Sequence, residues 1–288
     1  MAAKNLTFSD IVRRNIGDLN GRRRLASQVS EPLRRQLDYT SVSRRLIALS
    51  PLELGEPPLY DYDPMVTAYV VGEGGDHVRS EALGMDRTTV PLFEVTALPT
   101  IPISTIRSRL YPAVKRVLEK GVSSIKERLD IRVITTLAAA GSDPTSPNQP
   151  WTVSVPLVAD ILADAKGRIE AQGIPAARIL MNPITGADLL KFDHSVLSNE
   201  GVAANVKTGV LGEIYNMEVV TSRVCPRDLV IVLGEREFVG RMPERTPLTV
   251  VSADLPPERR VGFSMFMEVG VLCHNPAAIQ IINLTGRG

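Results

Sequence analysis

Apolar residues recur at helical spacing in the middle of the chain and predict two helices there. The first has Pro112 in its first turn, where the missing N–H costs little, and ends at Gly141. Its apolar stripe consists of Val114, Val117, Leu118, Ile125, Leu129, Val133 and Leu137. Gly121 lowers its local stability by roughly 1 kcal/mol relative to alanine and permits a bend. The second helix, over 155–172, ends at Gly173 and buries Leu157, Ile161, Leu162, Ala165 and Ile169.

Shorter apolar runs, bounded by glycine and proline, predict strands. An extended hairpin is expected from 65–71 and 88–98, joined through a flexible tip that includes Gly72, Glu73, Gly74, Gly75 and Asp76. The last third of the chain predicts a mixed α/β unit, with a short helix at 186–191 and strands at 179–181, 218–221, 229–233, 260–272 and 278–284. Ahead of residue 260 the chain is punctuated by Pro243, Pro247, Pro256 and Pro257.

Charge is distributed unevenly along the chain. Residues 1–45 contain ten basic residues against four acidic ones, although the whole chain has a net charge of only +1. The candidate interface or DNA-facing residues of this segment are Arg13, Arg14, Arg22, Arg23, Arg24, Arg34 and Arg35. Interleaved apolar residues favour short amphipathic helices that cannot form a core by themselves. Two interpretations follow: a solvated helix face, or a basic arm that contacts a neighbouring subunit and offers arginines to nucleic acid. A proline-rich linker ends near residue 64.

Composition narrows the class of protein. With 288 residues and 44% hydrophobic content, the chain is long enough to bury a substantial core. Its apolar runs are shorter than a membrane span requires, and its first residues lack the apolar centre of a signal peptide. Cys225 and Cys273 are too few for a disulfide framework, so reduced, buried thiols are expected. The protein is therefore expected to fold in the cytoplasm, without a membrane partner.

Candidate catalytic groups do not form a recognisable constellation. His77, His194 and His274 fall in three separate predicted elements, without a metal-binding helical spacing. Cys273 and His274 are neighbours in a predicted strand, so they point to opposite faces, with the cysteine expected to be buried. The run 192–195 contains Asp, His and Ser, but a catalytic triad forms from distant elements. The glycine-rich tip lacks the Lys-Ser/Thr of a phosphate-binding loop. We expect no catalytic residue, cofactor or metal.

Four segments of the last third occur in an order that resembles the major capsid protein of tailed bacteriophages. In that family a strand ending in Asn-Pro, a Gly-x-x-Gly turn before a strand, and a late strand with Val-Gly-aromatic recur in this order. The corresponding segments are Arg178–Pro183, Gly209–Arg223, Leu229–Gly234 and Val261–Leu272. The resemblance implies the α+β capsid fold called Hong Kong 97-like, with an N-terminal arm, an extended loop, a peripheral domain with a long spine helix, and an axial α/β domain.

The resemblance also implies domains, function and partners. The arm would be 1–63, the extended loop 64–103, the peripheral domain 104–149 with 241–275, and the axial domain 150–240 with 276–288. The protein would assemble into hexamers and pentamers of an icosahedral shell around double-stranded DNA. Such a shell would be a virion capsid built in the host cytoplasm, with portal, scaffold and cement proteins as further partners.

Part of this family forms a covalent bond between a lysine of the extended loop and an asparagine of a neighbouring subunit. The present chain has no lysine between Lys4 and Lys115, so its extended loop supplies no amine. Its shell is expected to be held together by non-covalent contacts or a cement protein. Two alternatives remain open: an encapsulin-type nanocompartment shell with the same fold, and a cytoplasmic α/β enzyme with a basic arm.

Overall fold

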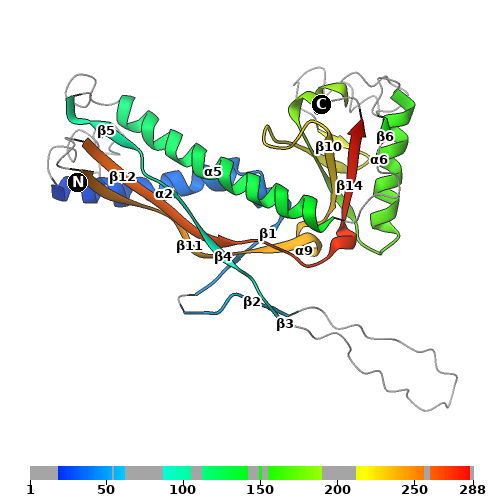
Figure 1. Cartoon of the computed structure of the whole chain (residues 1–288), viewed down its shortest axis with the longest axis horizontal. Helices are drawn as coiled ribbons and strands as arrows, with labels where there is room; N and C mark the ends of the chain where they lie inside the picture. Colours follow the sequence, from blue (N-terminus) through cyan, green and yellow to red (C-terminus); the bar gives the residue numbers. More distant parts are fainter. Residues whose placement is uncertain are drawn as a thin grey trace, which may run out of the picture.

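The computed structural model describes residues 19–53, 55–61, 87–104, 112–141, 149–150, 155–189, 212–255 and 260–285. These residues form two lobes, each built around one six-stranded sheet, and a small hairpin that leaves the molecule between them (Figure 1). We call them the elongated lobe and the compact lobe. The molecule is therefore long and divided, although the buried apolar residues of both lobes form one connected cluster.

The elongated lobe is a long, mostly antiparallel sheet covered by helices. Its strand order is β1-β11-β12-β4, with β13 beside β11 and β5 beside β12; only β1 pairs in parallel. The strands are β1 (Ala48–Pro51), β4 (Leu92–Ala97), β5 (Thr100–Pro102), β11 (Gly240–Leu255), β12 (Arg260–Gly270) and β13 (Leu272–Cys273). The helices are α2 (Leu19–Thr40), α3 (Ser43–Leu46) and α5 (Pro112–Ala140). Helices α2 and α5 contact each other and the sheet (Figure 1).

Helix α5 confirms the prediction from the apolar stripe. It spans 29 residues from Pro112 and ends before Gly141. Six residues of the predicted stripe are buried, and only Val117 is half-buried. Gly121 has a packing role, because a Cβ atom there would lie 2.8 Å from the sulfur of Met265 on β12. Glycine thus lets the helix backbone approach the sheet closely.

Strand β11 is the main element that the sequence did not predict. It runs through Pro243 and Pro247, residues that lack the N–H needed for a regular sheet ladder. The structure accommodates them because the pairing with β12 shifts register between Glu244 and Thr246 and again between Thr246 and Thr249. Irregularities of this kind are where a strand tolerates proline. The sequence pattern assigned no element to these residues, because the prolines interrupt it.

The compact lobe is a six-stranded mixed sheet of order β6-β14-β10-β7-β9-β8. Its strands are β6 (Gln149–Pro150), β7 (Ala176–Met181), β8 (Glu213–Ile214), β9 (Met217–Thr221), β10 (Leu229–Gly234) and β14 (Ile279–Thr285). Its helical segments are α6 (Val155–Glu170), α7 (Pro183–Leu189), α9 (Arg236–Val239) and the turn η2 (Pro276–Ala278). Helix α6 packs on β7, β10 and β14. The strands predicted at 179–181, 218–221, 229–233 and 278–284 all appear, with boundaries within three residues.

The Asn-Pro motif at the end of β7 has a clear physical role. Asn182 accepts a hydrogen bond from the Ile184 N–H at 3.0 Å, so it caps helix α7, and Pro183 occupies the first helical position. The same buried amide donates to the Cys225 carbonyl at 2.7 Å. Helix α7 therefore begins three residues before the predicted 186–191, because this cap was not recognised. The remainder of the predicted helix, from 190, lies outside the described residues.

The projecting hairpin consists of β2 (Leu59–Asp61) and β3 (Arg87–Thr89). The predicted strand 88–98 is in fact two strands, β3 and β4, separated at Val90 and Pro91. The Val90 N–H is bonded to the Pro58 carbonyl at 2.8 Å, and Pro91 has no N–H to continue a ladder. The predicted strand 65–71 and the tip residues Gly72, Glu73, Gly74, Gly75 and Asp76 lie outside the described residues.

Candidate functional site

Helix α2 carries the described part of the basic N-terminal segment. It is one continuous 22-residue helix rather than the several short helices expected. Leu25, Val29, Leu33 and Leu37 are buried, and the helix packs on β11 and α5 of the same subunit. Among the predicted arginines, Arg23, Arg24 and Arg35 are exposed, and Arg22 and Arg34 are half-buried; Arg13 and Arg14 lie outside the described residues. The exposed side of α2 is therefore a basic surface, interrupted by the pair of Arg35 with Glu31 at 3.1 Å.

The chain after α2 is fastened to the sheet by a buried ion pair. Arg44 donates to Glu244 of β11 at 2.7 Å, and the two side chains are 7% and 3% exposed. A buried pair of this kind tolerates removal of one partner poorly, because the other charge is then stranded away from water. The sequence showed Arg44 only as one of two adjacent arginines. Its partner Glu244 lies 200 residues away on β11, a strand that the sequence pattern did not predict.

A second buried polar contact joins the same segment to helix α5. Asp130 is 3% exposed and accepts hydrogen bonds from the Ser43 N–H at 2.9 Å and the Ser41 hydroxyl at 3.2 Å. The two serine hydroxyls are 2.6 Å apart. The carboxylate therefore holds the start of α3 against α5. In the sequence, the only indication of this contact is that Asp130 directly follows Leu129 of the predicted apolar stripe.

Ion pairs also join the two lobes. Glu218 on β9 of the compact lobe accepts from Arg178 on β7 at 3.2 Å and also pairs with Arg45, which follows α2. Arg223, in the loop after β9, pairs with Glu127 of α5 at 2.6 Å. The junction thus combines one acid from each lobe with arginines from distant parts of the chain. These pairs were not visible in the sequence, because their partners are 40 to 173 residues apart.

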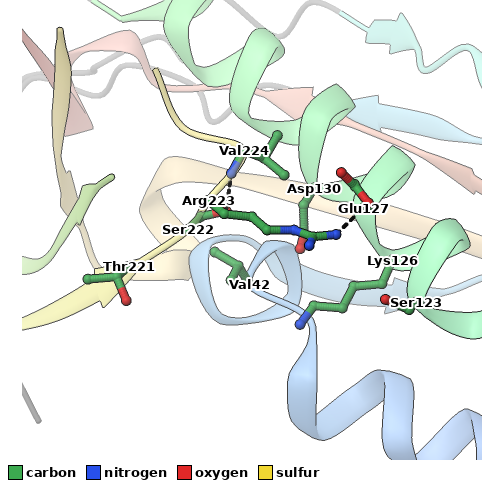
Figure 2. A pocket seen from close by; sticks show the side chains of 9 residues that line it. All are labelled: Val42, Ser123, Lys126, Glu127, Asp130, Thr221, Ser222, Arg223 and Val224. Carbon is green, nitrogen blue, oxygen red and sulfur yellow. Dashed lines mark hydrogen bonds and ion pairs between the residues drawn. The ribbon is translucent and has the colours of Figure 1, made fainter. Parts of the chain in front are cut away.

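A small polar cavity lies at this junction (Figure 2). It has a volume of about 150 Å³ and is lined by Val42, Ser123, Lys126, Glu127, Asp130, Thr221, Ser222, Arg223 and Val224. Figure 2 shows the Arg223 guanidinium reaching across to Glu127. Cations and carboxylates are balanced there, and the lining contains neither histidine nor cysteine. Around this cavity the protein offers ionic contacts between lobes and no arrangement for nucleophilic chemistry.

Among the described residues, those considered for catalysis are not assembled into a site. His77 and His194, with the run 192–195, lie outside the described residues. Cys225 is buried, whereas Cys273 and His274 are both half-buried, so the expected contrast between a buried Cys273 and a surface histidine is wrong. Burial raises the pKa of the Cys225 thiol to about 12 and that of Cys273 to about 11. Among the described residues, no cluster of His, Cys, Asp and Glu could hold a metal ion.

The base of the hairpin is anchored by aromatic and ionic contacts. Tyr60 stacks on the His274 ring with centroids 4.9 Å apart, and the Arg241 guanidinium lies 5.5 Å from the Tyr60 centroid. Arg87 donates to both carboxylate oxygens of Asp61, at 2.6 and 3.1 Å. This hydrogen bonding lowers the pKa of Asp61. The base of the hairpin is therefore held against the elongated lobe by Arg241 of β11 and by His274, which follows β13.

None of the described helices combines the length and apolar character that crossing a bilayer requires. No family model matches the chain, and no curated protein matches it in sequence.

Comparison with solved structures gives clear matches in fold. The virus-like particle from Pyrococcus furiosus matches with a TM-score of 0.61 and 14% identity, over 89% of this chain and 98% of that one. The capsid of a native GTA particle matches with a TM-score of 0.62 and 14% identity, over 84% of this chain and 89% of that one. A Microbacterium phage Oxtober96 structure matches with a TM-score of 0.61 and 13% identity, over 85% of this chain and 91% of that one. The chain therefore has the Hong Kong 97-like fold of phage capsids and virus-like particles, as the order of its sequence motifs predicts.

Proposed function

We propose that this protein is the major capsid subunit of a tailed bacteriophage and assembles into hexamers and pentamers of an icosahedral shell around double-stranded DNA. The observation that carries the proposal is the match in fold over most of both chains to proteins whose structures are a capsid and a virus-like particle. A two-lobed, elongated subunit also suits a thin shell, in which one body lies beside its neighbours and the other reaches the centre of a capsomer.

The four-part division stays part of this proposal: an arm, an extended loop, a peripheral domain and an axial domain. The elongated lobe supports the peripheral assignment, with α5 as the spine helix, and the compact lobe supports the axial one. Strand pairing argues for one refinement. Because β4 and β5 pair with β12, the extended loop leaves the body near Val90 rather than at residue 103. Likewise, β1 of the arm segment pairs with β11.

Subunits would be held together without lysine chemistry in the extended loop, because no lysine lies between Lys4 and Lys115. Arginine–carboxylate pairs are already the main ionic contacts within the subunit. The exposed arginines of α2, with Arg13 and Arg14 upstream, are available for similar pairs across subunits or for DNA. A cement protein would be a further non-covalent partner.

The proposal is tested by expressing the chain alone and examining it by sedimentation and negative-stain electron microscopy. We expect capsomers or closed shells, and a single band near 31.4 kDa when particles are boiled in denaturant. A stable monomer at physiological salt would refute the shell function. A ladder of covalent oligomers that resists reductant would refute the non-covalent account and leave the shell itself intact.

A second candidate is the shell of a nanocompartment that encloses a protein cargo. It is favoured by one comparison, because the chain covers 98% of the Pyrococcus furiosus virus-like particle subunit. The two functions predict different contents. Particles from the native source that hold nuclease-protected DNA of uniform length would support the capsid, whereas particles filled with one co-purifying protein would support the nanocompartment.

A further inference from the structure

Helix α5 carries a row of exposed basic residues along its outer side. Every fourth position from 116 to 132 is exposed, and the residues there are Arg116, Lys120, Ser124, Arg128 and Arg132. A helix rises 1.5 Å per residue, so the row is about 24 Å long. Neighbouring members lie one turn apart, and each step of four residues turns the row by about 40°, so the row is an inclined ridge that winds around the helix. We call these four cations and the central serine the α5 row.

The cations of the α5 row differ from the arginines that pair with carboxylates within the subunit. Within the part of the chain that the structure describes, none of the four has a carboxylate partner. Arg132 lies over the Phe93 ring, 5.5 Å from its centroid, which leaves its charge unneutralised. Eight other described arginines do pair with a carboxylate: Arg35, Arg44, Arg45, Arg87, Arg168, Arg178, Arg223 and Arg245. A row of four uncompensated cations therefore calls for an anionic partner outside the subunit.

The neighbouring surface strengthens this charge. Helix α2 lies beside α5 and adds the exposed Arg23 and Arg24 to the same helical layer. The sheet carries charge of the other sign. Glu94 on β4 is exposed, pairs in register with Glu268 of β12, and has no cation partner among the described residues. The elongated lobe is thus basic on its helices, while an unpaired acid stands on its sheet.

We infer that the α5 row is a contact surface for the phosphate backbone of double-stranded DNA, and that the helical face of the elongated lobe faces the interior of the shell. This inference rests on the proposed function, since it requires a shell that encloses DNA. Duplex DNA presents one negative charge per roughly 1.7 Å of its axis, so neighbouring cations of the row can each meet a phosphate. Such contacts read no sequence and suit a protein that must accept any packaged genome.

A protein partner fits this surface less well. Interfaces between proteins have an apolar and aromatic centre from which charged residues are depleted. The α5 row has a serine at its centre, its neighbour Ser123 is also exposed, and Ile131 is the one large exposed apolar residue of the helix. The stripe is therefore built for an evenly charged polyanion.

The test is a triple exchange, Arg116→Gln with Lys120→Gln and Arg128→Gln, in the full chain. Arg132 is kept because it packs on Phe93. The matched control, Arg168→Gln with Arg227→Gln and Arg236→Gln, removes the same charge from the compact lobe. Shell formation is followed by electron microscopy, and nuclease-protected DNA is measured per shell. In parallel, each protein is titrated with a short DNA duplex at several salt concentrations.

We expect the row variant to form normal shells with severalfold less protected DNA, while the control matches the unmodified protein. Each lost phosphate contact should reduce the slope of log K against log salt by about 0.9. Equal DNA content in the row variant and the unmodified protein would overturn the inference, as would an equal loss in the control. Loss of shells in the row variant alone would also overturn it, because the row would then lie between subunits. If the unmodified chain forms no shells, the proposed function fails, and the duplex titration still decides whether the row binds DNA.

Discussion

The two lobes are built on different principles. The compact lobe contains a sheet whose central strand β10 is apolar throughout; its Val230, Ile231, Val232 and Leu233 are all fully buried. The elongated lobe instead gathers strands from the beginning, middle and end of the chain and fastens them with buried polar contacts such as Arg44–Glu244. The first lobe therefore relies on apolar burial along its central strand, whereas the second adds buried polar contacts between distant segments to its apolar core.

The two cysteines, one near each sheet, report the burial of a thiol in each lobe. Burial raises the pKa of Cys225 to about 12, against an ordinary value near 9, so the thiolate is on the order of a thousandfold scarcer. We expect Cys225 to react with a thiol reagent at pH 8 far more slowly in the folded than in the denatured protein. Cys273, with a pKa of about 11, should react faster than Cys225. Mass spectrometry of labelled peptides measures both rates, and equal rates would contradict the difference in burial.

These pKa shifts also predict a direction for stability. A thiol whose folded pKa is raised keeps its proton when the unfolded chain has lost it. The stabilising contribution is therefore complete below about pH 9 and declines as the pH rises toward 11 to 12. Replacing both cysteines by alanine should flatten this alkaline part of the stability profile, measured by denaturant titration.

Breaking the buried ion pair should have the largest effect on folding. Glu244→Ala leaves the Arg44 guanidinium buried without its carboxylate, and we expect a loss of about 3 to 5 kcal/mol in the free energy of unfolding. Glu213→Ala, at an exposed position of the compact lobe, is the control. Cys273 should label faster in the first variant while Cys225 stays protected. An apolar replacement of both partners, Arg44→Met with Glu244→Leu, should recover most of the loss.

A cavity in the compact lobe should cost somewhat less. Leu180 is fully buried on β7, between β10 and β9. Leu180→Ala should destabilise the protein by about 3 kcal/mol, and the milder Ile179→Val by about 1 kcal/mol. Here the pattern of labelling should reverse, with Cys225 exposed first. If Leu180→Ala instead exposes Cys273 alone, the two lobes do not loosen independently.

The close approach of α5 to its sheet should give a smaller effect. Gly121→Ala adds a Cβ atom 2.8 Å from the Met265 sulfur, and overpacking of this kind costs about 1 to 3 kcal/mol. Alanine favours the helix by roughly 1 kcal/mol, so a net loss of about 1 kcal/mol is expected from thermal or chemical unfolding. Adding Met265→Ala should remove the steric part. A more stable Gly121→Ala variant would show that the helix and sheet are loosely packed.

The same division explains how far the sequence could predict the structure. Elements with an uninterrupted period, such as α5 and β10, were correct because local burial alone determines them. Strand β11 was missed because its prolines are tolerated only through irregular pairing with β12, a property of two segments together. The exposed arginines of α2 were recognised as basic, yet Arg44 and Arg45 are visible as ion-pair residues only once β11 and β9 are in place. Residue type was readable from sequence; partnership across 100 or more residues was not.

The smallest effect is expected from an ion pair of the same chemistry on the surface. Arg168 and Asp164 lie one turn apart on α6, 2.9 Å from each other, with side chains 38% and 66% exposed. A double-mutant cycle with Arg168→Ala and Asp164→Ala should give an interaction energy of about 0.3 to 0.5 kcal/mol. Because exposed charges are screened, the coupling should fade as salt approaches molar concentration. The Arg44–Glu244 coupling should persist under the same conditions, since salt ions cannot reach a pair that is almost fully buried. Equal salt sensitivity of the two couplings would mean that water and ions reach the Arg44–Glu244 pair. The buried polar contacts of the elongated lobe would then not distinguish it from the compact lobe.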